Sequence, residues 1–106
     1  MINTAAMRAG AIDDLLNSDP DVSARAFHEL IVTDLGPELS KIVVPTTVLY
    51  VTPKGGQITD AEIDGFYKAA YTPLKGAILK RIPASAHVIM WDQPERFQSE
   101  VIAFLR

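Results

Sequence analysis

The stretch from Ile78 to Leu105 constrains the fold more than any other part of the sequence. Its pattern predicts a strand, a tight loop that carries His87, a short apolar stretch and an amphipathic helix. A loop at the end of a strand takes its position from a rigid sheet, and catalytic residues are common on such loops. The pattern therefore indicates a segment that holds one reactive imidazole at the end of a sheet.

An earlier strand and helix complete a βαβ unit. The run from Ile42 to Val51 is β-branched and nearly continuously apolar, which is typical of a parallel strand buried on both faces, with Pro45 at its first residue or edge. After a loop that contains Pro53, Gly55 and Gly56, residues that interrupt helices and strands, Thr59 and Glu62 form the capping box of a helix. The inward face of that helix is predicted to hold Ile63, Phe66, Tyr67, Ala70 and Tyr71. Such a connection predicts that the two strands are parallel.

Residues 1–36 are predicted to be a separate helical segment ahead of the βαβα unit of residues 37–106. Residues 2–16 show a moderate helical period, and Asp19 and Pro20 are typical of the start of a second helix that runs to Leu35. The apolar face of this second helix comprises Phe27, Leu30, Ile31 and Leu35. The expected fold class is α/β, and because two parallel strands leave open edges, further strands must come from elsewhere.

The composition narrows the function classes. A chain of 106 residues forms one domain or less and can bury roughly 65% of its unfolded surface. A net charge of −3 with scattered Lys and Arg argues against nucleic acid as a partner. Without cysteine, a leader-like segment or a long apolar run, we expect a cytoplasmic protein that does not enter membranes. No metal-ligand spacing, phosphate loop or dinucleotide fingerprint is present, so no cofactor is expected.

The end of the chain carries a more specific pattern. His87 is followed by four mainly apolar residues, then Asp92, any residue, Pro94 and Glu95, and a helix that ends in Phe104 and Leu105. In this order and spacing, residues 37–106 resemble the C-terminal portion of an α/β-hydrolase, and residues 1–36 resemble a piece of its helical cap. The resemblance implies hydrolysis of a small ester, amide or related acyl compound, with His87 as the general base that takes a proton from a serine hydroxyl.

Two parts of such a site are missing from these residues. None of the five serines lies in a Gly-x-Ser-x-Gly segment, and the oxyanion-hole segment is also absent, so the chain alone is predicted to be inactive. The loop after the first strand, where the family usually places the triad acid, has no carboxylate. Asp60 in the capping box and, less directly, Asp34 are the candidates for that acid. Asp92 is instead assigned to capping the last helix.

The remaining aromatic and histidine residues have both structural and functional interpretations. Met90 and Trp91 could line an acyl or alcohol pocket, or Trp91 could pack under the last helix. His28 is predicted to be a solvated helix residue. We expect either association with a missing N-terminal half or a homo-oligomer. The alternative function is a non-enzymatic α/β module that binds a partner or a second copy through its strand edges.

Overall fold

Two short parallel strands form the centre of the computed structural model, which describes residues 1–106. The protein is mixed α/β, with six helices and one two-stranded sheet. The elements in chain order are α1 (Ala5–Asn17), α2 (Pro20–Val32), the 3₁₀ helix η1 (Gly36–Lys41), β1 (Thr47–Tyr50), α3 (Asp60–Ala70), β2 (Ile78–Arg81), α4 (Ile89–Asp92) and α5 (Pro94–Leu105).

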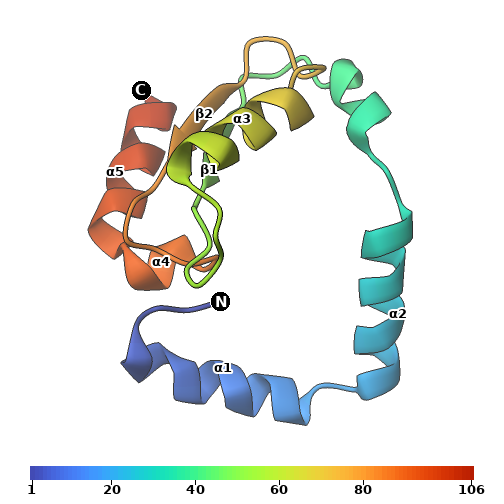
Figure 1. The fold of residues 1–106 in the computed structure, drawn as a ribbon, viewed down its shortest axis with the longest axis vertical. Coiled ribbons are helices and arrows are strands. Elements are labelled where there is room, and N and C mark those ends of the chain that lie inside the picture. Colours follow the sequence, from blue (N-terminus) through green and yellow to red (C-terminus); the bar gives the residue numbers. More distant parts are fainter.

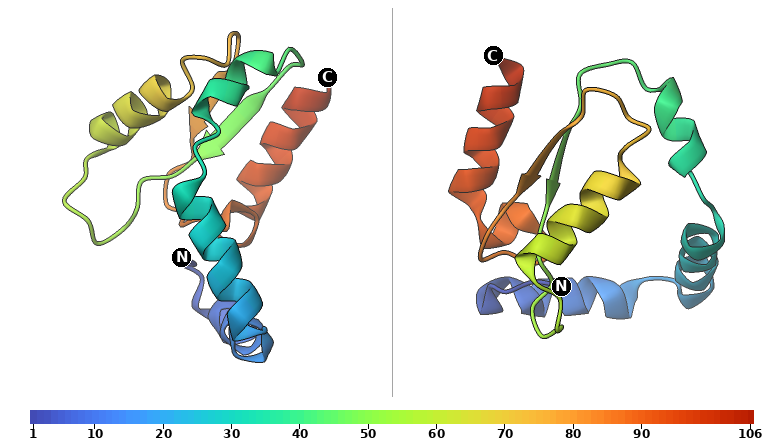
Figure 2. Two further views of the ribbon diagram at one scale, coloured as in Figure 1. Left: turned by 90° about the vertical axis from the view of Figure 1, so that its right-hand side faces the viewer. Right: turned by 45° about the horizontal axis from the view of Figure 1, so that its top comes forward.

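The βαβ unit confirms the predicted parallel arrangement. Strand β1 pairs with β2 in a register that places Thr47 beside Ile78 and Tyr50 beside Arg81. Helices α3 and α5 lie on opposite sides of the two strands (Figures 1 and 2). Both faces of the small sheet are therefore partly covered, as parallel strands require.

The predicted start of α3 is also confirmed. The backbone N–H of Glu62 donates to the Thr59 hydroxyl at 3.3 Å, and the Glu62 carboxylate accepts from the Thr59 backbone N–H at 2.7 Å. These reciprocal bonds satisfy two of the free donors at the helix start. The bonds from the Thr59 backbone and hydroxyl hold the pKa of Glu62 below its usual range.

The core is small and lies around the carboxyl ends of the strands and the α3 face. The buried apolar side chains are Tyr50, Ile63, Leu74, Ile82 and Ile89. The ring of Tyr50 stacks on Tyr67 with 4.3 Å between centroids. On the other face, Lys80 of β2 forms an ion pair with the buried Glu100 of α5, and this hydrogen bond from Lys80 lowers the pKa of Glu100.

Two predictions about burial in the βαβ unit are wrong. The first strand spans only Thr47–Tyr50 rather than Ile42–Val51, and Val43 ahead of it is 91% exposed. Without further strands beside it, β1 has only one neighbour, so its side chains are mostly half-buried. Phe66 and Ala70 of α3 are also exposed rather than inward, whereas Ile63 is buried and Tyr67 stacks on Tyr50 of β1.

Helices α1 and α2 form an arm that arches from below α4 to η1 and stands apart from the sheet (Figure 1). Asp19 caps α2 as predicted, accepting from the N–H groups of Asp21 and Val22. The helix ends at Val32 rather than Leu35, and the Asp34 carboxylate accepts from the Gly36 N–H, a local bond that competes with helical continuation. The predicted apolar face does not pack, because Phe27, Leu30 and Ile31 are 63%, 73% and 68% exposed.

The chain exposes more surface than a compact protein of its size. Its accessible area is 8296 Å², whereas a compact monomer of this mass has about 5,800 Å². It buries about half of its unfolded surface rather than the predicted 65%. The radius of gyration of 15.8 Å likewise exceeds the roughly 13 Å expected for a compact chain. These residues expose surface that a compact protein would cover.

Candidate functional site: the histidine loop

The loop that carries His87 begins where β2 ends. The N–H of Ile82 donates to the Tyr50 carbonyl at 2.8 Å, which extends the strand ladder by one bond, and the Ile82 side chain is only 1% exposed. Ala84 then takes a left-handed conformation with φ of 54°, which costs a non-glycine residue on the order of 1 kcal/mol. The Gln93 side-chain amide donates to the Ala84 carbonyl at 3.1 Å and holds this turn. The loop is therefore anchored at its start.

Asp92 anchors the residue next to His87. Its carboxylate accepts from the Ala86 N–H at 2.8 Å, from the Asn3 N–H at 2.9 Å and from the Thr4 N–H at 2.7 Å. The Thr4 hydroxyl donates to the same carboxylate at 2.8 Å. We call this set of bonds the Asp92 clasp. It ties the start of the chain to the histidine loop although the two segments are far apart in sequence.

The prediction that Asp92 caps the last helix is wrong. Pro94 occupies the first position of α5, so the cap position belongs to Gln93, whose side chain makes no capping bond. Pro94 could have indicated this from the sequence, because proline favours the first helical position and fixes the cap one residue before it. The contact between Asp92 and the N-terminal residues has no local sequence signal.

The electrostatics of Asp92 follow from the clasp. Partial burial alone would raise the pKa of Asp92 by disfavouring the charged form. The hydrogen bonds from the backbone of Asn3, Ala86 and Thr4 outweigh this effect and hold its pKa well below its usual range. Asp92 is therefore a fixed anion at neutral pH.

The imidazole of His87 is exposed, while the residues on either side are partly or fully packed. Ala86 is held by Asp92, Val88 is half-buried, and Ile89 is buried. Ser85, the nearest serine in sequence, is buried, and its hydroxyl donates to the Ala86 carbonyl at 2.9 Å. The structure thus presents an accessible imidazole on an anchored backbone, and no hydrogen bond joins a serine to the ring.

Asp60 lies at the same end of the sheet but serves other partners. No ion pair joins it to His87; its carboxylate accepts from the Arg81 guanidinium at 2.8 Å and from the Thr52 hydroxyl at 2.6 Å. Arg81 also donates to Asp64 at 3.0 Å. The structure therefore gives Asp60 a structural role between β2 and the start of α3.

The neighbouring Asp64 completes this polar network. The Tyr50 hydroxyl donates to Asp64 at 2.7 Å, and this bond, followed by the contact with Arg81, lowers the pKa of Asp64. The same bond raises the pKa of Tyr50. Sequence patterns did not indicate this network, because its members come from β1, α3 and β2 and meet only once the sheet has formed.

A cleft of about 240 Å³ opens at the carboxyl ends of the strands. It is lined by Thr52, Pro53, Lys54, Asp60, Arg81, Ile82, Pro83, Ala84 and Ser85. The first residues of the histidine loop form one wall of it, and His87 itself is not part of the lining. Five of its nine lining residues are polar or charged, whereas small-molecule sites are usually lined mainly by apolar side chains.

The other predicted site residues lie in different places. Met90 and Trp91 are partly exposed on α4, and neither lines the cleft at the strand ends. Asp34 lies near the other end of α3, beside Tyr71 and Leu39. His28 is exposed on α2, as predicted, with its Nδ1 3.8 Å from a Glu29 carboxylate oxygen.

Three further observations bear on the class of site. No group of His, Asp or Glu side chains is arranged to hold a metal ion. None of the helices has the length and apolar character that a membrane crossing requires. No protein-family model matches this chain, and no match was found among curated proteins or solved structures.

Proposed function

We propose that this chain is the C-terminal part of an α/β-hydrolase-like fold, in which His87 is the general base for hydrolysis of a small ester, amide or related acyl compound. The observation that carries the proposal is the exposed imidazole on an anchored loop beyond the carboxyl end of a parallel strand. Ligands of open α/β sheets gather at this end. The helix α5, which follows the loop and covers one face of the sheet, supports the same interpretation.

The chemistry assigns His87 one task. Its ring would take the proton of a serine hydroxyl as that oxygen attacks the acyl carbon, and would return the proton to the leaving group. The serine and the oxyanion donors must come from polypeptide other than these 106 residues, because Ser85 is buried and bonded within the loop. The Asp92 clasp would hold the loop backbone in place, a positioning role for that carboxylate.

The acid that orients the imidazole also has to come from elsewhere or from a rearranged loop. Asp60 is neutralised by Arg81, and Asp34 lies near the other end of α3. The excess exposed surface of the chain supports an additional polypeptide that completes the sheet. In this proposal, α1 and α2 correspond to part of a cap.

A fluorophosphonate probe, which labels activated serines, tests the proposal on the polypeptide that the natural gene encodes, with any coding sequence upstream of Met1. We expect labelling that His87→Ala abolishes. His28→Ala is the matched control and should label normally, because His28 is exposed on the arm. Absence of labelling, or labelling that persists in His87→Ala, would overturn the proposal.

A second candidate function is a non-enzymatic α/β module that assembles through its strand edges. The observation that favours it is the open sheet of only two strands. Exposed edges present unpaired backbone groups to other chains. The same probe experiment separates the two functions, because an assembly module contains no activated serine.

A further inference from the structure

Strand β1 has one paired side and one free side. The Thr46 carbonyl accepts from the Ile78 N–H at 3.0 Å, and the Tyr50 carbonyl accepts from the Ile82 N–H at 2.8 Å. In a parallel ladder, alternate residues bond to the same neighbour. The alternate residues Thr47, Leu49 and Val51 therefore turn their backbone N–H and C=O groups to the free edge.

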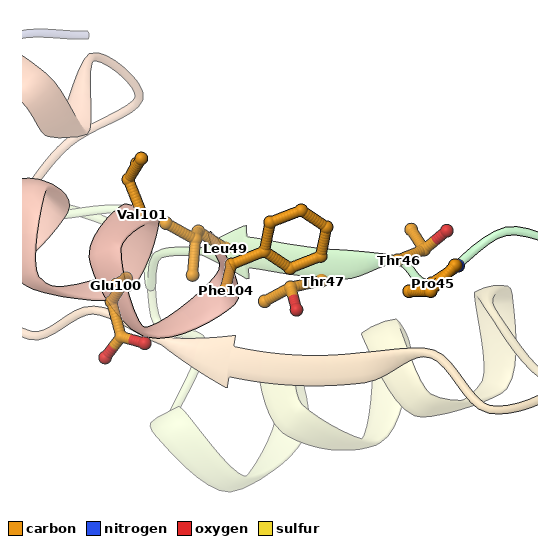
Figure 3. A pocket seen from close by; sticks show the side chains of 7 residues that line it. All are labelled: Pro45, Thr46, Thr47, Leu49, Glu100, Val101 and Phe104. Atoms are coloured by element: carbon orange, nitrogen blue, oxygen red, sulfur yellow. The ribbon is translucent and has the colours of Figure 1, made fainter. Parts of the chain in front are cut away.

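An apolar groove lies beside this free edge (Figure 3). Its volume is about 280 Å³, and Leu49 of β1 meets Val101 and Phe104 of α5 in its wall. Val101 and Phe104 remain 38% and 51% exposed. The helix thus offers apolar side chains to the space next to β1, where the side chains of an added strand would lie.

The sequence around the edge is self-complementary. Pro45 and Pro53 each lie four residues from Leu49, and neither has an N–H to donate. An antiparallel pairing centred on Leu49 would set Leu49 opposite Leu49 of a second copy. It would also set Thr47 opposite Val51, which are both β-branched, and end at a proline on each side. A two-fold symmetric contact of this kind uses the same patch on both chains.

We propose that the free edge of β1 pairs antiparallel with the same edge of a second copy, centred on Leu49, to give a four-stranded sheet in the order β2–β1–β1–β2. The two-fold axis is perpendicular to the sheet, so both α5 helices lie on one face and the two Leu49 side chains fill the groove between them. This inference rests on the second candidate function, the α/β module that assembles through its strand edges. A second copy on this edge of β1 takes the place that a strand of a separate N-terminal half would occupy there.

The surface of the chain is large enough for such a contact. The accessible area exceeds that of a compact monomer by about 2,500 Å² per chain, an excess that includes the unpacked arm as well as the β1 edge. A stable interface needs about 800 Å² from each partner. Figure 2 shows β1 in front of β2 when the sheet is viewed from the side of α2. The second copy therefore enters on the side of the arm, whose hydrogen bonds to the sheet unit come from Asn3 and Thr4.

A single-cysteine experiment tests the register directly, because the chain has no cysteine of its own. Directly opposed residues in a hydrogen-bonded antiparallel pair have Cα atoms about 5.5 Å apart, within the range that a disulfide spans. Under mild oxidation, Leu49→Cys should therefore form a covalent dimer. Val48→Cys is the matched control on the same strand, since its own symmetry mate is two residues out of register and should not cross-link.

A cysteine on α2 tests whether the two copies instead meet through the arm. Leu30→Cys should remain monomeric after oxidation, whereas efficient cross-linking there would place the contact on α2 and overturn the proposal. Circular dichroism of each variant verifies that it retains the helical content of the parent chain.

Sedimentation equilibrium supplies a test that does not depend on cysteine. The parent chain should be dimeric at high concentration, and Thr47→Pro should lose the dimer, because it removes an edge N–H that β2 does not use. Thr47→Val retains the N–H and should dimerise like the parent. A parent chain that is monomeric at every concentration, or a Thr47→Pro variant that still dimerises, would contradict the proposal. Neither result bears on fluorophosphonate labelling, so the two proposals fail separately.

Discussion

The arm of α1 and α2 and the βαβα unit have similar local signals but differ in what they bury. Asp19 caps α2 and Thr59 caps α3, each with the bonds that its sequence predicts. None of the residues of α1 or α2 is buried, whereas the sheet unit encloses Tyr50, Ile82 and Ile89. Caps are satisfied by their own neighbours in sequence, but an apolar face needs another element. The arm therefore shows which part of the chain lacks its packing partner.

Removing one large apolar side chain from each region is the strongest test of this difference. Ile82→Ala should lower the free energy of unfolding by about 2–5 kcal/mol, because Ile82 is fully packed. Leu30→Ala, the matched change in the arm, should lower it by less than about 0.5 kcal/mol. Urea titrations at low protein concentration measure both values. Equal losses would show that the arm packs in solution and would break the comparison.

The Asp92 clasp joins the two regions, so its removal should separate them. Asp92→Asn should increase hydrogen exchange at the amides of Asn3, Thr4 and Ala86, while the amide of Ile82 stays protected. Because the folded-state pKa is lowered, the stabilisation is fully present above the unfolded pKa of about 3.9. It is lost only as the pH falls below that value through the lower folded pKa. A clasp already released at pH 5 in the parent protein would contradict this account.

Removing the N-terminal cap of α3 or of α2 compares the same two regions with smaller expected effects. Thr59→Ala should cost about 1 kcal/mol of global stability, because α3 contributes Ile63 to the core. Asp19→Ala should reduce helical circular dichroism from α2 with little change in the urea midpoint, because α2 does not pack on the sheet unit. Similar midpoint shifts for the two variants would show that α2 unfolds together with the core.

The smallest expected effect concerns catalysis. The isolated chain should hydrolyse a short-chain aryl ester no faster than an equivalent concentration of free imidazole, and His87→Ala and His28→Ala should lower that rate equally. Both rings are exposed, and neither has a serine beside it. Saturable turnover that His87→Ala abolishes would show that these residues contain a nucleophile of their own.

The parts of the fold predicted from sequence are those that local chemistry determines. The capping box of Thr59 and Glu62, the cap of Asp19 and the parallel βαβ order follow from spacing within one segment. The length of β1 and the burial of Phe27 and Phe66 depend on which other elements pack against them, and local sequence does not determine this. The predictions for these features were wrong.

In the candidate site, too, locally determined features were predicted and features that depend on distant contacts were not. The position of His87 on a loop after β2 was predicted, because a strand followed by a loop can be recognised locally. The role of Asp92 and the pairing of Asp60 with Arg81 were not predicted, because both depend on contacts between distant segments. The position of Pro94 was the only available signal against Asp92 as a helix cap.

The central claim is that another polypeptide covers the free edge of β1. Amide hydrogen exchange of Thr47 and Leu49, measured in the natural gene product at high concentration, tests it most directly. The account predicts protection comparable to that of the Ile82 amide, which is bonded to Tyr50 within the sheet. Exchange of the Thr47 and Leu49 amides at unprotected rates, while Ile82 remains protected, would contradict it.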